Sequence, residues 1–82
     1  MQVLLFARLR DELGCDQVEL SATDAGTIAS VRAALIQRWP DKASLLAAGR
    51  AMVAVNQSLI QNEQHALQST DEVAFFPPMT GG

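Results

Sequence analysis

Short apolar runs of strand length and one longer helical pattern follow one another along the chain of 82 residues. The run QVLLFARL (2–9) is continuously apolar up to Ala7, which predicts a central strand buried on both faces, followed by a short helical turn or loop that ends at Gly14. The next segment, DQVELS, alternates apolar and polar residues, as a half-exposed strand paired with the first strand does. Three further strands are predicted, the second of them very short, within residues 51–56, 57–60 and 71–76.

An amphipathic helix is predicted between the second and third strands. Its apolar residues recur at steps of three and four, which places them in one stripe: Ile28, Val31, Leu35 and Trp39. Thr27 is a suitable N-cap, because its hydroxyl accepts a hydrogen bond from an otherwise unpaired backbone N–H group. Pro40 ends the helix, since it disfavours the helical region at Trp39. A second, shorter helix is expected over residues 41–49, with Asp41 as its cap.

The order of these elements predicts an α+β fold. One long helix must lie across one face of a mixed sheet, because at this chain length its apolar stripe and the inward-facing strand residues have only one another to pack against. We therefore predict a ubiquitin-like β-grasp with a mixed sheet of about five strands and one main helix. The domain is expected to span residues 1–78, and residues 79–82 to form a flexible, protruding tail. A ferredoxin-like fold would need two full crossover helices, and only one segment is long enough.

Charge and composition narrow the classes of partner. A net charge of −3 and a pI near 4.8 argue against a nucleic-acid ligand, which clustered Lys and Arg would bind. Arg8 and Arg10 are the nearest approach to a basic cluster, and two interpretations stay open for them: a solvated face or contact with a carboxylate-bearing partner. The single cysteine, Cys15, needs no oxidising compartment, and the first apolar run is too short to span a bilayer. A cytoplasmic protein without a membrane partner is expected.

The C-terminal residues FFPPMTGG carry the most specific pattern in the chain. Pro77 and Pro78 lack backbone N–H groups, so the last strand must end at Phe76 and the chain must leave the sheet there. Gly81 and Gly82 have no Cβ, which lets the backbone enter a slot too narrow for other residues. The reactive group would then be the terminal carboxyl, which is a poor electrophile until it is converted to an acyl-adenylate.

Machinery for that conversion is missing from the sequence. The chain has no glycine-rich phosphate loop and no paired His or Cys at metal-ligand spacing, and His65 is its only histidine. The sequence thus predicts no metal site and no bound cofactor, and ATP would be used by another protein. The chain is expected to be a carrier whose C-terminal arm visits the active sites of other enzymes.

Three segments carry a resemblance to a known family: DEVAFFPPMTGG, VLLFARLRDELG and AVNQSLI. Together they resemble the small, sulfur-carrying subunit of molybdopterin synthase, a β-grasp protein, over most of the chain. The resemblance implies that an adenylating enzyme related to ubiquitin-activating enzymes uses ATP to adenylate Gly82, with Gly81 as its slender neighbour. A sulfurtransferase system then leaves a thiocarboxylate on Gly82. The large synthase subunit receives this sulfur for cyclic pyranopterin monophosphate, in a heterotetramer of two small and two large subunits.

Interface residues follow from the same resemblance and from side-chain parity. Phe76 falls on the opposite face of its strand from Val73 and Phe75, so we assign it to an apolar surface that contacts the large subunit. Phe6 and Leu59 are candidates for the same surface, and core burial remains an alternative for both. The segment that follows the strand completes the predicted interface with Pro77, Pro78, Met79 and Thr80.

Two other functions remain open at this stage, as does the simpler interpretation that the glycines are a frayed end on a plain binding domain. A thiamine-type sulfur carrier also ends in Gly-Gly, although that group generally lacks the FFPP approach. A ubiquitin-like modifier would instead be joined through Gly82 to lysines of target proteins. In either of these functions, as in the synthase, the chain has no catalytic groups of its own and acts only as a subunit or substrate of other enzymes.

Overall fold

The computed structural model describes residues 1–21 and 25–78, so the predicted tail at residues 79–82 lies outside the described part of the chain. The secondary-structure elements are, in chain order, β1 (Gln2–Leu5), α1 (Ala7–Leu13), β2 (Gln17–Glu19), α2 (Ile28–Arg38), the 3₁₀ turn η2 (Pro40–Lys42), α3 (Ala43–Leu46), β3 (Met52–Val55), β4 (Ser58–Leu59) and β5 (Val73–Phe76).

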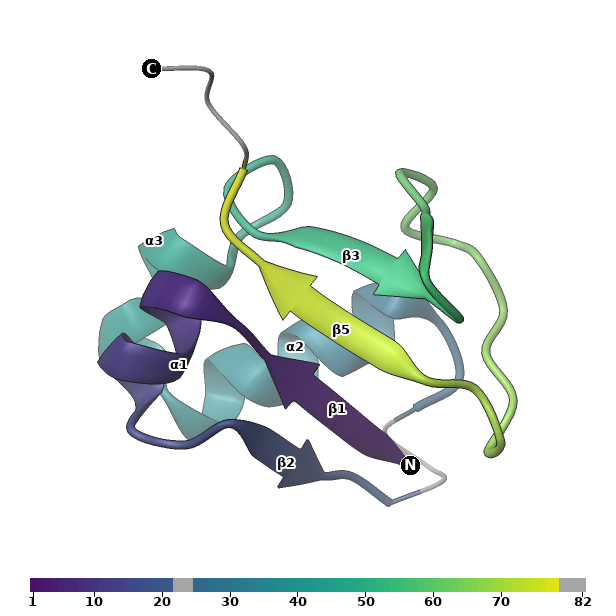
Figure 1. Ribbon diagram of the computed structural model, residues 1–82, viewed down its shortest axis with the longest axis horizontal. Coiled ribbons are helices and arrows are strands. Elements are labelled where there is room, and N and C mark those ends of the chain that lie inside the picture. The colour runs from purple at the N-terminus through teal and green to yellow at the C-terminus, as the bar shows by residue number, and fades with distance from the viewer. Residues whose placement is uncertain (22–24, 79–82) are drawn as a thin grey trace.

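The strands form one mixed sheet in the order β2-β1-β5-β3-β4. β5 is parallel to β1 and antiparallel to β3, and the outer strands β2 and β4 pair antiparallel with their neighbours. The strand nearest the C-terminus therefore occupies the centre of the sheet, next to the strand nearest the N-terminus (Figure 1). The helices lie on one face of this sheet, so the predicted β-grasp architecture is confirmed.

The main helix begins and ends as the sequence predicts. The Thr27 side chain accepts a hydrogen bond from the Ser30 backbone N–H at 3.1 Å, and the Ser30 hydroxyl accepts one from the Thr27 N–H at 2.9 Å. This reciprocal pair satisfies two N–H groups that the first helical turn leaves unpaired. α2 ends at Arg38, before Pro40, and the Trp39 N–H donates to the Leu35 carbonyl.

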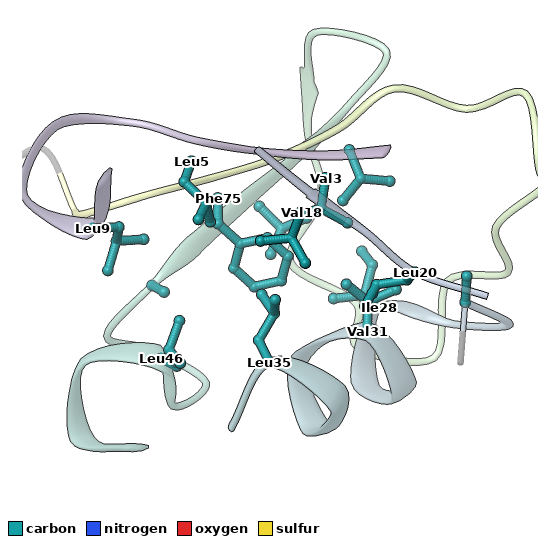
Figure 2. Packing of buried hydrophobic residues seen from close by; sticks show 14 of the residues in the cluster. Val3, Leu5, Leu9, Val18, Leu20, Ile28, Val31, Leu35, Leu46 and Phe75 are labelled. Atoms are coloured by element: carbon teal, nitrogen blue, oxygen red, sulfur yellow. The ribbon is translucent and has the colours of Figure 1, made fainter. Parts of the chain in front are cut away.

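The core lies between the sheet and the helices, as Figure 2 shows. Alternate strand residues point toward α2, and the Phe75 ring lies above Leu35. Nine of the larger side chains in this layer have an exposed fraction below 2 %: Phe75, Leu5, Ile28, Leu35, Leu46, Val3, Val31, Val53 and Val73.

Two expectations from the sequence are wrong. The first strand does not run on to Ala7 with both faces buried, because β1 ends at Leu5, Phe6 is exposed, and Ala7 begins α1 with a φ of 54°. Helical spacing in the same segment places Leu9 and Leu13 on the buried side of α1, which the apolar run obscured. Asp41 is not the cap of the second helix, because it lies inside η2 and Lys42 precedes α3.

Candidate functional site at the end of the central strand

The candidate site is the segment where the chain leaves the sheet, residues 76–78, which we call the tail root. β5 pairs on one side with β1 and on the other with β3, and Phe76 opposite Met52 is the last pair. Pro77 and Pro78 have no N–H group to extend this ladder, so the chain must depart from the sheet here. The tail root thus starts from the central strand of the sheet, which is paired on both sides.

Sheet topology decides what surrounds the tail root. Because β1 is parallel to β5, the end of β1 and the start of α1 lie at the same end of the sheet as the tail root. The Phe6 N–H donates to the Phe75 carbonyl oxygen at 3.1 Å, which fixes this flank. Because β3 is antiparallel to β5, the loop that enters β3 lies at the same end on the other flank (Figure 1).

The face of the sheet away from the helices, which we call the open face, is largely apolar. Strand pairing places Leu4 beside Ala74, Ala74 beside Ala54, and Ala54 beside Leu59, in a row that crosses the sheet. This side-chain row belongs to the face opposite the core, because Val3, Leu5, Val53, Val55, Val73 and Phe75 alternate with it.

Two large apolar side chains on or beside the open face are exposed, and one of them is next to the tail root. Phe6 is 46 % exposed and Leu59 is 53 % exposed, and they are the two large apolar residues of the described chain classed as exposed. Core burial, the alternative left open by the sequence, therefore does not apply to either of them. Phe76 and Pro77 are half-buried and Pro78 is exposed. The structure brings Phe6, Phe76, Pro77 and Pro78 together at one end of the sheet, whereas Leu59 lies on an outer strand.

The remaining predicted site residues lie outside the described part of the chain. They are Met79, Thr80, Gly81 and Gly82. Their roles stay predictions, as does the contact of the open face with a partner.

Arg32 is the residue that sequence reasoning missed. It lies on α2 and is only 7 % exposed, and its guanidinium makes a bidentate pair with Glu63, with both N–O distances at 2.8 Å. One terminal nitrogen also donates to the carbonyls of Leu46 at 2.6 Å and Ala51 at 3.0 Å. The guanidinium lies over the Phe75 ring, 5.3 Å from its centroid. The sequence signal that could have indicated a buried arginine is the position of Arg32 among the regularly spaced apolar residues of α2.

Arg32 joins α2 to the last residue of α3, to the loop before β3 and to the loop that contains Glu63. The guanidinium, mainly through its hydrogen bonds, holds the pKa of the Glu63 carboxyl below its ordinary value of 4.5. A cavity of about 230 Å³ beside this pair is bordered by Gly49, Met52, Val53 and Ile60, among others. It presents no nucleophile or base to a ligand other than the already paired Glu63.

A second polar network lies where β5 begins. The Asn56 amide donates to the Asp71 carboxylate at 3.0 Å, and its oxygen accepts from the Glu72 N–H at 2.9 Å. The Gln68 N–H also donates to Asp71 at 2.8 Å, and these hydrogen bonds, that from Gln68 first, lower the pKa of Asp71. Asn56 and Gln57 both have positive φ, as a tight hairpin turn between β3 and β4 requires. The network fixes loops, and it lies at the opposite end of β5 from the tail root.

Neither a metal-binding cluster nor a membrane-spanning helix is found in the described part of the chain. No cluster of three or more His, Cys, Asp or Glu side chains at metal-binding distance occurs within residues 1–21 and 25–78. In that same part of the chain, no helix has the length and apolar content needed to cross a membrane.

Comparison with known proteins identifies relatives over the whole chain. Residues 3–82 match the ThiS family. The chain is 42% identical over 82 residues to a protein of Haemophilus influenzae named molybdopterin synthase sulfur carrier subunit, and it covers 99% of that protein. It is 44% identical over 85 residues to the protein of the same name from Escherichia coli, again covering 99%.

Solved structures agree with the fold. The crystal structure of SAMP1 from Haloferax volcanii superposes with a TM-score of 0.78 at 24% identity, covering 99% of this chain and 97% of that one. One chain of a complex between subunits 1 and 2 of the molybdopterin-converting factor from Helicobacter pylori superposes with a TM-score of 0.68 at 23% identity, covering 99% and 96%. At these identities the likeness shows the fold alone.

Proposed function

The chain belongs to the ThiS family, and from this membership we propose that it is the sulfur-carrier subunit of a molybdopterin synthase. The proposal depends on one observation: the chain is more than 40% identical, over its full length, to two proteins of that name. In this proposal other proteins supply the chemistry, and the chain supplies its C-terminus.

In the proposed reaction Gly82 is the residue that changes. Its carboxylate oxygen attacks the α-phosphorus of ATP on an adenylating enzyme, and pyrophosphate leaves. The outer sulfur of a sulfurtransferase persulfide then attacks the carbonyl carbon and displaces AMP, and a thiol cleaves the resulting acyl disulfide, which leaves a thiocarboxylate on the terminus and a disulfide on the sulfurtransferase side. The thiocarboxylate sulfur is finally transferred to cyclic pyranopterin monophosphate on the large subunit. Gly81 keeps the approach to Gly82 free of side-chain atoms.

The described structure supplies a platform suited to this work. β5 is hydrogen-bonded on both sides and carries Val73 and Phe75, each 0 % exposed, so the tail root has a fixed direction of departure. Beyond Pro78, four extended residues reach at most about 14 Å, enough to enter a partner's active site. We propose that Phe6, Phe76 and Leu59 on and beside the open face pack against the large subunit, with Pro77, Pro78, Met79 and Thr80 at the cavity entrance.

The assembly and its surroundings are part of the proposal. Partners are the large subunit, an adenylating enzyme related to ubiquitin-activating enzymes, and a sulfurtransferase system, with two small and two large subunits in the working synthase. The chain contributes to a sulfurtransferase only as the donor subunit and uses no resident cofactor. Its location in the cytoplasm stays a prediction from the sequence.

A deletion tests the proposal against its alternatives. Removing Gly81 and Gly82 is expected to abolish sulfur transfer by the reconstituted synthase, while the circular dichroism spectrum and the melting temperature stay unchanged. The matched control replaces Thr80 by Ser and keeps both glycines. Full transfer by the shortened chain would contradict the proposal. Co-purification with a thiamine-pathway enzyme in place of the large subunit, or Gly82 in isopeptide linkage to lysines in cells, would support the other two functions instead.

A further inference from the structure

Charged side chains are distributed unevenly along the strands of the sheet. Glu19, at the end of β2, and Asp71 and Glu72, before β5, lie at the end of the sheet where β5 begins. Within the described residues, Glu19 lies 3.6 Å from the N-terminal ammonium group, whereas Asp71 and Glu72 have no cationic partner within ion-pair distance. The opposite end, which carries the tail root, has arginines on both flanks, although the chain as a whole has a net charge of −3.

Arg8 and Arg50 flank the tail root from two different elements. Arg8 is exposed in the first turn of α1, two residues after Phe6, whose N–H is bonded to the Phe75 carbonyl. Arg50 is exposed in the loop that enters β3. Arg50 precedes Met52, the partner of Phe76, by two residues and therefore lies at the tail-root end of the sheet. β5 lies between β1 and β3, so the two arginines lie on opposite sides of the tail root.

Neither of these guanidinium groups has a counter-charge among the described residues. No side-chain hydrogen bond or ion pair joins Arg8 or Arg50 to residues 1–21 or 25–78. Other charges at this end of the molecule largely cancel. Arg10 lies 3.6 Å from the Asp11 carboxylate, and Lys42 lies 3.3 Å from that of Glu12.

Two further carboxylates are on elements that do not adjoin β5. Asp16 lies at the same end of the sheet, where its carbonyl accepts from the Leu5 N–H, but it precedes β2, which β1 separates from β5; Asp41 is in η2. Arg38, at the end of α2, is stacked on Trp39 with its guanidinium carbon 5.4 Å from the ring centroid. The uncompensated positive charge beside the tail root therefore comes from Arg8 and Arg50.

We propose that Arg8 and Arg50 form a recognition pair for carboxylates on the rim of the protein cavity that the C-terminal segment enters, an inference that rests on the proposed function. Arg8 and Arg50 are expected to contact the rim of that cavity and not its reaction centre, because of the length of the C-terminal segment. A chain of four residues beyond Pro78 extends at most about 14 Å, so side chains beside the tail root meet the mouth of the cavity when the terminus reaches its floor.

The chemistry of the guanidinium group and the net charge of the chain both favour an acidic protein, and not a nucleic acid, as the partner of this arginine pair. Arg keeps its charge at any physiological pH and binds a carboxylate through two parallel N–H donors. A phosphate backbone would need a larger basic surface than two arginines, and the carboxylates elsewhere on this chain would repel it. With positive charge at the tail root and negative charge at the far end, the field of the chain turns the C-terminus toward an acidic rim during approach.

The same rim chemistry is expected on each protein that handles the C-terminus. The adenylating enzyme and the large subunit both have to admit the same tail root between the same two arginines. Other chains that end in Gly-Gly share those terminal residues with this carrier. Recognition of Arg8 and Arg50 therefore distinguishes this carrier from them.

Association kinetics test this inference. The probes are the large subunit and the adenylating enzyme from the same organism, each mixed with the full chain at low and at physiological salt. The double substitution Arg8→Glu and Arg50→Glu is expected to lower the association rate with both proteins about tenfold at low salt and to weaken its salt dependence, because charges at the edge of an interface act mainly on approach. Replacing both arginines with lysine should retain most of the rate.

Arg38→Glu is the matched control, since it makes the same charge change per site on an exposed arginine of the helix side. We expect its association rates to change less than about twofold. Equal rates for the double variant and the unsubstituted chain, or an equally large loss from Arg38→Glu alone, would overturn the inference and leave the proposed function standing. Binding of the unsubstituted chain to neither protein would contradict the proposed function itself, and the inference with it. Tighter binding of the unsubstituted chain to single-stranded DNA than to both proteins would also overturn the inference.

Discussion

The two faces of the sheet differ in what their apolar side chains contact. On the helix-covered face, Val3, Leu5, Val73 and Phe75 are each at most 1 % exposed and pack against α1, α2 and α3. On the open face, Leu59 of β4 is 53 % exposed, and Phe6, which follows β1 at the tail-root end of the sheet, is 46 % exposed. Both faces are built by the same strands. Exposed apolar area that no helix covers is typical of a surface that contacts another protein.

Phe75 and Phe76 show this difference between neighbouring residues. The Phe75 ring lies under the Arg32 guanidinium and above Leu35 and is 0 % exposed, whereas Phe76 is half-buried beside Met52. Stability is therefore determined by one face and, in the proposed function, partner contact by the other. Substitutions on the two faces should consequently have separable effects.

The largest difference in the free energy of unfolding is expected between substitutions of two phenylalanines, one on each face. Phe75→Ala removes a fully buried ring and should lower the free energy of unfolding by about 3–5 kcal/mol. Phe6→Ala removes a ring that is already half in water and should change it by less than about 1 kcal/mol. Urea titration followed by circular dichroism measures both. Equal losses of stability would show that Phe6 is as much a part of the core as Phe75.

Loss of the buried arginine is expected to have the next largest effect. Arg32→Met keeps similar bulk but leaves the Leu46 and Ala51 carbonyls and the Glu63 carboxylate without their donor. The free energy of unfolding should fall by about 3 kcal/mol. Arg38→Met, on an exposed arginine, should change it by less than about 0.5 kcal/mol in the same titration. A stability loss no larger than that of the control would mean that the Arg32 network contributes nothing net.

A substitution on the open face should change the affinity for the large subunit and not the stability of the fold. Phe6→Asp is expected to weaken the complex with the large subunit about tenfold, because an exposed ring at an interface is replaced by a charge that must be desolvated. The free energy of unfolding should remain close to that of the unsubstituted chain. Isothermal titration calorimetry gives the dissociation constant, with Ala33→Asp on the exposed side of α2 as the control. Unchanged affinity would remove Phe6 from the predicted interface.

The smallest effect concerns pH. Since Arg32 lowers the pKa of Glu63 in the folded chain, the ionised pair stabilises the fold above pH 4.5, the ordinary pKa, and this contribution is lost as the pH falls through the lower folded value. Glu63→Gln should flatten the stability curve from the ordinary pKa of 4.5 down to the lower folded pKa. Thermal melts across this range measure it. A curve with the same slope for both chains would contradict the role assigned to the pair.

Much of the fold was predictable because periodicity reports which residues face the core. Ile28, Val31 and Leu35 have helical spacing and all are 0 % exposed, and Thr27 caps their helix as its residue type indicates. The segment after Leu5 was misread because an apolar run does not distinguish a continuing strand from a turn into a helix. The positive φ of Ala7, where the two meet, has no signature in the residue type.

The candidate site was predictable in part. The prolines at positions 77 and 78 indicate where the strand must end, and side-chain parity separates Phe76 from Phe75. Sequence alone could not show Arg32 as a buried residue, because its Glu63 partner is 31 residues away and the two meet only through the loop geometry of the folded chain. The same applies to Arg8 and Arg50, which flank one point in space from two distant segments.

The central claim is that the C-terminal glycine carries sulfur and the folded domain presents it. Intact-mass spectrometry after incubation with the adenylating enzyme, ATP and the sulfurtransferase system tests this claim most directly. We predict the mass increase for replacement of one oxygen by sulfur, located on Gly82 by fragmentation and absent when ATP is omitted. An unchanged mass, under conditions that convert a known carrier of the same family, would contradict the account.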